Sequence, residues 1–164
     1  MITFQEAKKI AEGELIKLYF SDTDSLIIID NEIIEKEYAW IFPYTSKKFY
    51  ETKDFMHAIG GNGPLFISKT DGKVSRYRTG LNIDGMIDEY EEENKVWTLF
   101  IADNTFADTQ KSLAVKTILG LTNSQFVDLK TKKYFQTGSI RRLSNIQQQL
   151  STKNIQSDIK LTTN

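Results

Sequence analysis

Two segments in the N-terminal half of the chain carry apolar residues at the 3.6-residue spacing of an amphipathic helix. The first covers about residues 4–20, and Thr3 with Glu6 gives it a capping-box start. Its apolar face holds Phe4, Ala7, Ile10, Ala11, Leu15 and Leu18. The second begins near Asn82 or Asp84, either of which can cap it. Its apolar face holds Ile83, Met86, Ile87 and Tyr90.

Between these segments the pattern is that of strands. A buried strand is expected at 26–30, after the turn cluster SDTDS at 21–25. Residues 38–44 alternate, and one face holds Tyr38, Trp40, Phe42 and Tyr44. We expect Trp40 and Phe42 in the core. Because Pro43 has no N–H to donate, this strand is expected at a sheet edge or bulged there. Two more strands, 64–68 and 73–80, flank Asp71-Gly72, a pair that favours a tight hairpin turn.

The C-terminal half begins with a strand at 95–103 and ends with one at 155–162. Three helical segments lie between them, at 107–121, 121–132 and 137–154. Four residues of the first are expected inside: Leu113, Val115, Ile118 and Leu119. Thr122 or Asn123 can cap the second helix, and the third has apolar positions at Ile140, Leu143, Ile146 and Leu150.

The pattern therefore predicts an α+β protein with two domains. Residues 1–93 are expected to place an N-terminal helix on an antiparallel sheet of about four strands, with a second helix. Residues 95–164 are expected to form a small strand–helix–helix–helix–strand unit. The acidic segment 91–94, sequence EEEN, is the expected joint, and its carboxylates are expected on a solvated face.

Charge divides the chain in the same way. Residues 1–94 carry 11 Lys and Arg against 18 Asp and Glu, a net charge of −7. Residues 95–164 carry 10 Lys and Arg against 4 Asp and Glu, a net charge of +6. This difference indicates two units with different surfaces. Neither half has the strong basic patch of a nucleic-acid binder, so no nucleic-acid partner is expected.

Composition excludes several classes of site. The chain has no cysteine, which removes disulfides, thiol catalysis and cysteine-based zinc sites. The charged N-terminus is unlike a signal peptide, and apolar runs such as the four residues 26–29 are far too short to cross a membrane. We therefore expect a cytoplasmic protein with no membrane partner.

Candidate catalytic residues are few. His57 is the single histidine, and a lone histidine without a positioned constellation is more typical of a surface or capping residue than of a catalyst. Asp22 and Asp24 resemble the start of a calcium loop, but Ile27 occupies its glycine position and Ile33 its last position. Glu35 and Glu37 are expected to be solvated. We therefore expect no enzyme activity, no metal and no cofactor.

The glycine-rich stretch GGNGP at 60–64 could in principle cradle a phosphate. A phosphate loop opens a helix, whereas this stretch precedes a strand, and Pro64 lacks an N–H donor. A sharp bend is the better interpretation, with positive φ at one or more of the four residues 60–63.

The segment from Trp40 to Gly80 resembles the immunity protein 35 family, also called the YrhB-like domain. The family pattern joins an aromatic strand, here Trp40, Phe42 and Tyr44, to a GNGP turn, here Asn62, Gly63 and Pro64. A strand, an xxDG hairpin with Asp71 and Gly72, and a helix complete it. The resemblance covers about 1–93 and implies a small α+β domain without catalytic residues. It also implies a bacterial immunity protein of a polymorphic toxin system, although a chaperone-like relative has been described.

Residues 95–164 are similar in pattern to the C-terminal domain of the bacterial ribosomal stalk protein. Lys116, the segment 119–121 and Leu129-Lys130 carry this resemblance, but Thr122, Asn123 and Ser124 stand where the stalk domain has lysines. The resemblance implies a shape and not recruitment of translation factors.

Three hypotheses follow: a toxin-neutralising protein, a chaperone or interaction module without a toxin, and a small enzyme using His57. The first implies a protein partner, and it leaves the oligomeric state open. Exposed aromatic and arginine side chains near loops are the expected contacts. These candidates are Tyr44, Phe49, Tyr50, Arg76 and Arg78.

Overall fold

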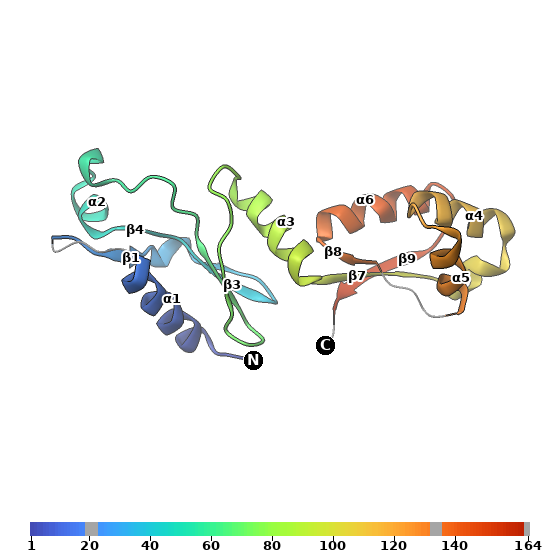
Figure 1. The fold of residues 1–164 in the computed structure, drawn as a ribbon, viewed down its shortest axis with the longest axis horizontal. Coiled ribbons are helices and arrows are strands. Elements are labelled where there is room, and N and C mark those ends of the chain that lie inside the picture. Colours follow the sequence, from blue (N-terminus) through green and yellow to red (C-terminus); the bar gives the residue numbers. More distant parts are fainter. Residues whose placement is uncertain (19–22, 132–135, 163–164) are drawn as a thin grey trace. The chain divides into compact units, whose positions relative to one another are not determined.

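The computed structural model describes residues 1–18, 23–131 and 136–162 and consists of two compact units, residues 1–86 and 87–164 (Figure 1). The division falls inside helix α3 (Ile83–Asn94). Helices and antiparallel sheets occur together, which confirms the predicted α+β class. No helix in the described part of the chain combines the length and the apolar character needed to cross a bilayer. The expected end of the first helix near residue 20, and Asp22, lie outside the described residues.

The first unit contains two sheets. Its strands are β1 (Leu26–Ile28), β2 (Ile34–Glu35), β3 (Ala39–Phe42), β4 (Tyr44–Ser46), β5 (Leu65–Ser68) and β6 (Val74–Ser75). Its helices, besides the start of α3, are α1 (Phe4–Leu18) and α2 (Lys47–Thr52), with the 3₁₀ turns η1 (Asp30–Glu32) and η2 (Phe55–His57). Strands β2-β3-β5-β6 form a four-stranded antiparallel sheet, and β1 pairs with β4.

Helix α1 packs on the four-stranded sheet through small residues. Ala7 and Ala11 are fully buried against Phe42, Leu65 and Ile67. Alanine lets the helix axis approach the sheet closely. Both N–H and hydroxyl of Thr3 bond the Glu6 carboxylate at 2.8 Å, which confirms the predicted capping box. Phe4 contacts the ring of Trp40 at a centroid distance of 5.0 Å.

Pro43 led us to expect an edge strand or a bulge, and the first of these alternatives is wrong for the strand that precedes it. β3 lies between β2 and β5, and it ends at Phe42. Pro43 separates it from β4, which pairs with β1 instead. The missing N–H is thus accommodated by a break in the strand, and the Pro43 carbonyl accepts from Ile29 N–H at 2.9 Å. β1 itself is half-buried and not fully buried as predicted.

The second unit begins with the end of α3 and is built on one three-stranded sheet. Its elements are β7 (Trp97–Ile101), η3 (Asp103–Ala107), α4 (Thr109–Ile118), α5 (Asn123–Thr131), β8 (Gln136–Gly138), α6 (Ile140–Ser151) and β9 (Ser157–Leu161). The sheet order is β8-β7-β9, all antiparallel. Strand β8 was absent from the predicted order. The core holds Leu99, Val115, Leu121, Leu143, Leu150 and Ile155.

Two predictions of burial in this unit are wrong. Leu113 is 60% exposed, whereas Ser112 and Val115 are the buried residues of α4. Glu91 was expected in solvent but is 2% exposed. Its Oε2 accepts from the N–H of Ile140, the first residue of α6, at 2.8 Å. A carboxylate is stabilised there by the unpaired N–H groups and the positive end of the helix dipole.

Candidate partner-binding surface

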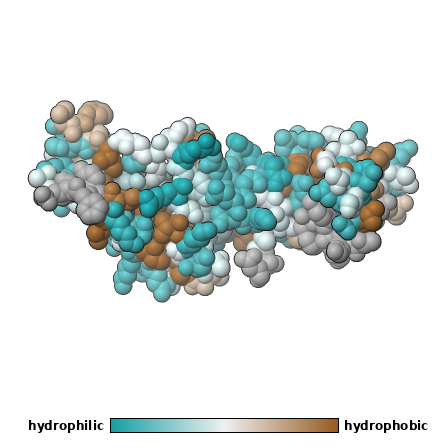
Figure 2. Space-filling view, in the orientation of Figure 1, coloured by the Kyte–Doolittle hydropathy of each residue, from teal (hydrophilic) through white to brown (hydrophobic). Residues whose placement is uncertain are grey.

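Residues 47–57, here called the α2–η2 tip, present large apolar side chains to solvent. Phe55 is 83% exposed, Met56 87% and Tyr50 42%. In Figure 2 the pale brown surface at the upper left covers the region where Figure 1 draws α2 and the turn after it. An exposed apolar group of this kind is typical of an interaction site.

Local capping shapes the tip. Ser46 Oγ accepts from the N–H of Phe49 at 3.0 Å and starts α2. Lys53 then adopts the left-handed conformation, φ 58°, and its N–H bonds the Phe49 carbonyl at 2.8 Å. Asp54 Oδ1 accepts from Met56 N–H at 2.9 Å and starts η2. The chain therefore turns sharply at Lys53, and the turn brings Phe55 and Met56 out beside α2.

Asp24 holds the base of the tip. Its carboxylate accepts from the Ser46 hydroxyl at 2.6 Å and from the N–H groups of Lys48 at 3.1 Å and Ser25 at 2.8 Å. The hydrogen bond from Ser46 is the main cause that lowers the pKa of Asp24, and the two N–H groups lower it further. The cluster expected to be a simple turn thus anchors an element more than twenty residues away.

Ring contacts order the side chains of the tip. Phe49 is half-buried, and its ring lies 5.8 Å from that of Phe55, centroid to centroid. Lys53 Nζ lies 4.5 Å from the centre of the Tyr50 ring. Phe49, a predicted contact residue, therefore lies against Phe55, and Tyr50, also predicted, follows Phe49 on α2.

Tyr44 lies at the root of the tip, because it begins β4, which runs directly into α2. Arg76 lies near enough for its charge to act on the Tyr44 hydroxyl. Burial raises the pKa of the half-buried Tyr44 hydroxyl, while the charge of Arg76 acts in the opposite direction. Arg76 Nη2 lies 3.3 Å from Glu14 Oε2. The pKa of Glu14 is lowered, first by its hydrogen bond from Lys17 and then by the positive charges of Lys17 and Arg76.

The fifth candidate, Arg78, lies in another segment. It lines an open hollow of about 590 Å³ with Tyr77, Thr79, Gly80 and Leu81. Four of the five predicted contact residues are therefore near the α2–η2 tip. Phe49 and Tyr50 lie on it, Tyr44 precedes it, and Arg76 acts on Tyr44.

The glycine-rich stretch is hydrogen-bonded to the strand that leads into the tip. Asn62 donates its side-chain N–H to the carbonyl of Tyr44 at 2.7 Å. Gly61 has φ 74°, so the expected positive φ is confirmed at that residue. Gly63 has no positive φ, and a Cβ there would lie 3.2 Å from the Tyr77 carbonyl oxygen. Pro64 is half-buried and leads directly into β5.

The hairpin residues pack against α1. Gly72, φ 74°, would place a Cβ 2.9 Å from Ile10 Cδ1. Its N–H bonds the Ser68 carbonyl at 2.9 Å, which confirms a hairpin between β5 and β6. Asp71 accepts from Lys73 N–H at 3.1 Å. Trp40 packs under Lys69, whose Nζ lies 4.1 Å from the ring centre.

Catalytic chemistry has little support in this unit. His57 is half-buried at the end of η2. Glu35 is exposed and paired with Lys69 at 2.7 Å. Within the described ranges no group of three or more His, Cys, Asp or Glu side chains is placed to hold a metal ion.

Sequence reasoning missed Phe55 and Met56, the most exposed residues of the tip. They form a two-residue apolar pair without periodicity, and nothing local distinguishes such a pair from a buried one. The neighbouring Asp54, a capping residue, was the available signal that a new turn starts there.

Comparison with known proteins gives a family match that lies within the first unit. Residues 5–83 match the family model described as immunity protein 35. No curated protein and no solved structure matches the chain. The similarity of residues 95–164 to the ribosomal stalk domain has no support from these comparisons, and the side chains of Leu129 and Lys130 lie outside the described residues.

Proposed function

Because residues 5–83 place the N-terminal unit in the immunity protein 35 family, we propose that the protein binds a cognate toxin and neutralises it by covering its surface or active site. The toxin would belong to a bacterial polymorphic toxin system, and both proteins would meet in the cytoplasm. The protein partner is the ligand, and no step requires an enzyme activity or a cofactor.

The α2–η2 tip is the proposed contact surface, and its exposure is the observation that carries the proposal. Interfaces draw most of their binding energy from a few aromatic and other large side chains that become fully buried. Tyr50, Phe55 and Met56 have area to bury. The bonds from Asp24 and Asn62 fix the base of the tip, so little ordering remains to be done on binding.

Charge supports rapid association with a basic partner. The net charge of −7 over residues 1–94 would attract a positively charged toxin and raise the association rate at low salt. The tip would supply the apolar contact, and the net negative charge of residues 1–94 as a whole would supply the steering.

The test is co-expression with the product of the adjacent gene, followed by co-purification and a growth assay. Phe55→Ala with Met56→Ala should raise the dissociation constant by roughly thirtyfold or more, since two such contacts supply about 2 kcal/mol. Ile16→Ala is the matched control, because Ile16 is 76% exposed but lies on α1. It should leave binding unchanged.

Unchanged binding and protection in the tip variant would place the contact elsewhere. Absence of protection against any toxin of the same locus would refute the immunity function itself.

A chaperone-like function is the second candidate, because Met56 and Phe55 also suit the capture of unfolded apolar segments. That function predicts suppression of aggregation of unrelated proteins, with no need for a toxin. The third hypothesis, catalysis by His57, predicts that His57→Ala abolishes a measured turnover.

A further inference from the structure

Strand β9 is an outer strand of its sheet, and the register defines which of its backbone groups point outward. Residues on β9 pair with β7, with Asp158 opposite Phe100. Ala102 N–H donates to the Gln156 carbonyl at 3.0 Å, so residue 156 has its hydrogen-bonding groups toward β7. Because these groups alternate along a strand, 158 and 160 also face β7. The N–H and C=O groups of Ser157, Ile159 and Leu161 therefore face the outer edge.

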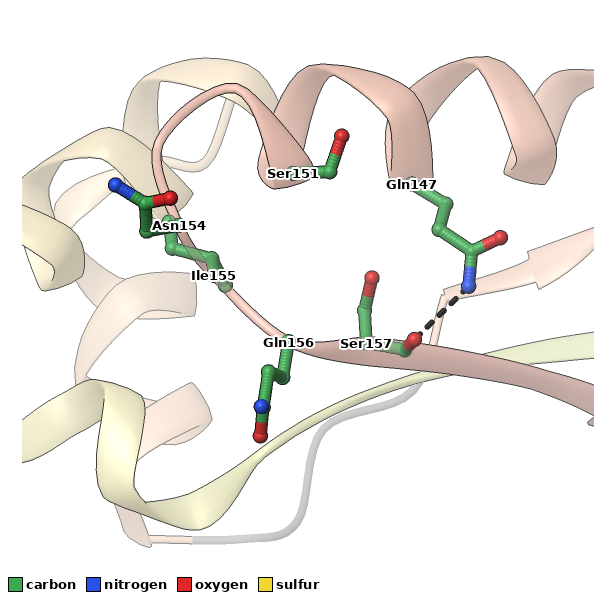
Figure 3. A pocket seen from close by; sticks show the side chains of 6 residues that line it. All are labelled: Gln147, Ser151, Asn154, Ile155, Gln156 and Ser157. Carbon is green, nitrogen blue, oxygen red and sulfur yellow. Dashed lines mark hydrogen bonds between the residues drawn. The ribbon is translucent and has the colours of Figure 1, made fainter.

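Most of this edge has no hydrogen-bond partner within the described residues. The carbonyl of Ser157 accepts from Gln147 Nε2 at 2.9 Å, as Figure 3 shows. The remaining outward groups of Ser157, Ile159 and Leu161 bond to none of the described residues. An uncovered edge of five residues is a ready template for pairing with another strand.

The sequence of β9, SDIKL, is self-complementary in charge. If two copies of the strand pair antiparallel about Ile159, then Asp158 of each copy lies opposite Lys160 of the other. These positions are non-hydrogen-bonded pairs, in which the opposing side chains are closest. Within one strand Asp158 and Lys160 form an ion pair with each other at 3.1 Å, but they are 63% and 65% exposed, so they can exchange this surface pair for the two cross-strand pairs. The two cross-strand pairs are related by the twofold axis, so they form together.

We propose that the second unit pairs with a second copy of this chain through β9, joining two three-stranded sheets into one of six strands. We choose a second copy as the partner because the antiparallel register centred on Ile159 does two things at once. It gives hydrogen-bond partners to the outward backbone groups of β9, and it places Asp158 opposite Lys160 of the other copy. Residues 158 and 160 lie on the open face of the sheet. Ile159 lies on the face that carries α6 and would contact Ile159 of the second copy beside the core.

The surface beside this edge fits an approaching main chain. A hollow of about 750 Å³ lies between the end of α6 and the start of β9 (Figure 3). It is lined by uncharged side chains: Gln147, Ser151, Asn154, Ile155, Gln156 and Ser157. In the proposed register Thr162 of the second copy lies opposite Gln156, at the margin of the hollow. Amide and hydroxyl groups there can bond peptide groups without the cost of burying a charge.

Charge reversal tests the register. The full chain should sediment as a dimer in analytical ultracentrifugation. Asp158→Lys alone would place lysine opposite lysine in both cross-strand pairs of the dimer. Lys160→Asp alone would place aspartate opposite aspartate in the same two pairs. Each should raise the dimer dissociation constant about tenfold or more. The double variant Asp158→Lys with Lys160→Asp restores opposite charges and should restore the dimer. Lys153→Asp, an exposed reversal outside the strand, is the control and should leave the dimer intact.

Two results would overturn the proposal. One is a monomeric wild-type chain at the highest soluble concentration, which would mean that Lys160 and Asp158 protect the edge from pairing. The other is a dimer unaffected by the single reversals, or not restored by the double variant while circular dichroism shows it folded. Toxin binding through the α2–η2 tip is measured separately, so failure of one proposal leaves the other standing.

Discussion

Gly63 shows how one residue can be required for its surroundings and not for its own backbone. Its φ is not positive, so alanine would meet no strain in the main chain. The added Cβ would instead lie 3.2 Å from the Tyr77 carbonyl oxygen and 3.4 Å from Met86 Cε. Gly63→Ala should therefore lower the free energy of unfolding by about 1–2 kcal/mol, as overpacking does. Urea denaturation measures it.

Gly60 provides the control for this prediction. A Cβ there would meet nothing within 4 Å, and its φ is also not positive. Gly60→Ala should leave the unfolding free energy unchanged or raise it slightly, because it restricts the unfolded chain. Equal losses in both variants would contradict the account of Gly63.

Asp24 should make the stability of the first unit depend on pH. Its pKa is lowered from the ordinary value of 3.8, chiefly by the Ser46 hydroxyl. A carboxyl with a lowered folded-state pKa stabilises fully above its unfolded pKa and loses that contribution as pH falls through the folded value. The unfolding free energy of the wild type should therefore fall more steeply below about pH 4 than that of Asp24→Asn.

The comparison should be made by urea denaturation from pH 7 downward on both proteins. All other carboxyls are shared, so the difference between the two curves isolates Asp24. Parallel curves would show that Asp24 does not anchor the tip through its charge.

At the scale of elements, we expect the buried side chain of Glu91, which caps the start of α6, to contribute strongly to stability. Glu91→Ala would leave the N–H of Ile140 without its partner and should cost about 2 kcal/mol of unfolding free energy. Glu91→Gln keeps an acceptor oxygen and should cost less. Glu93→Ala is the control, because Glu93 is exposed. Indifference to all three changes would contradict the capping role.

Helix starts were predictable because their signals are local. Thr3, Asn82 and Thr122 were named as capping residues, and each accepts a hydrogen bond from the N–H three residues later. Strand pairing is not local. Nothing near Pro43 tells whether a strand is central and interrupted or lies at an edge, and β8 has only three residues, with no alternation to detect. Glu91 was misjudged for the same reason, since its partner lies 49 residues away.

At the scale of the whole chain, the site was only half predictable. Tyr44, Phe49, Tyr50 and Arg76 were named because aromatic and arginine side chains favour interfaces, and the structure brings them to the tip and its root. Phe55 and Met56 became visible only through their exposure. The family resemblance rested on the order and spacing of the aromatic strand, the glycine-rich bend and the hairpin. That pattern can be read from the sequence even though none of its residues alone would identify the family.

Chelation should leave the whole molecule unchanged. The chain has no cysteine, and its described part contains no cluster of His, Asp and Glu suited to a metal. We expect excess EDTA to leave both the melting temperature and the proposed partner binding unaltered. A lower melting temperature in EDTA would reveal a metal that these residues do not suggest, and metal analysis of the purified protein would identify it.

The way the α2–η2 tip is fastened has a consequence for how specificity can change. The residues that anchor the tip lie outside residues 47–57. Asp24, Ser46 and Asn62 form hydrogen bonds with main-chain atoms or with one another, and not with the side chains that face solvent. Tyr50, Phe55 and Met56 can thus be exchanged with little effect on the frame that carries them. Related domains could therefore acquire new protein partners by changes confined to this short segment, and a different recognition sequence could be grafted onto the same three anchoring residues.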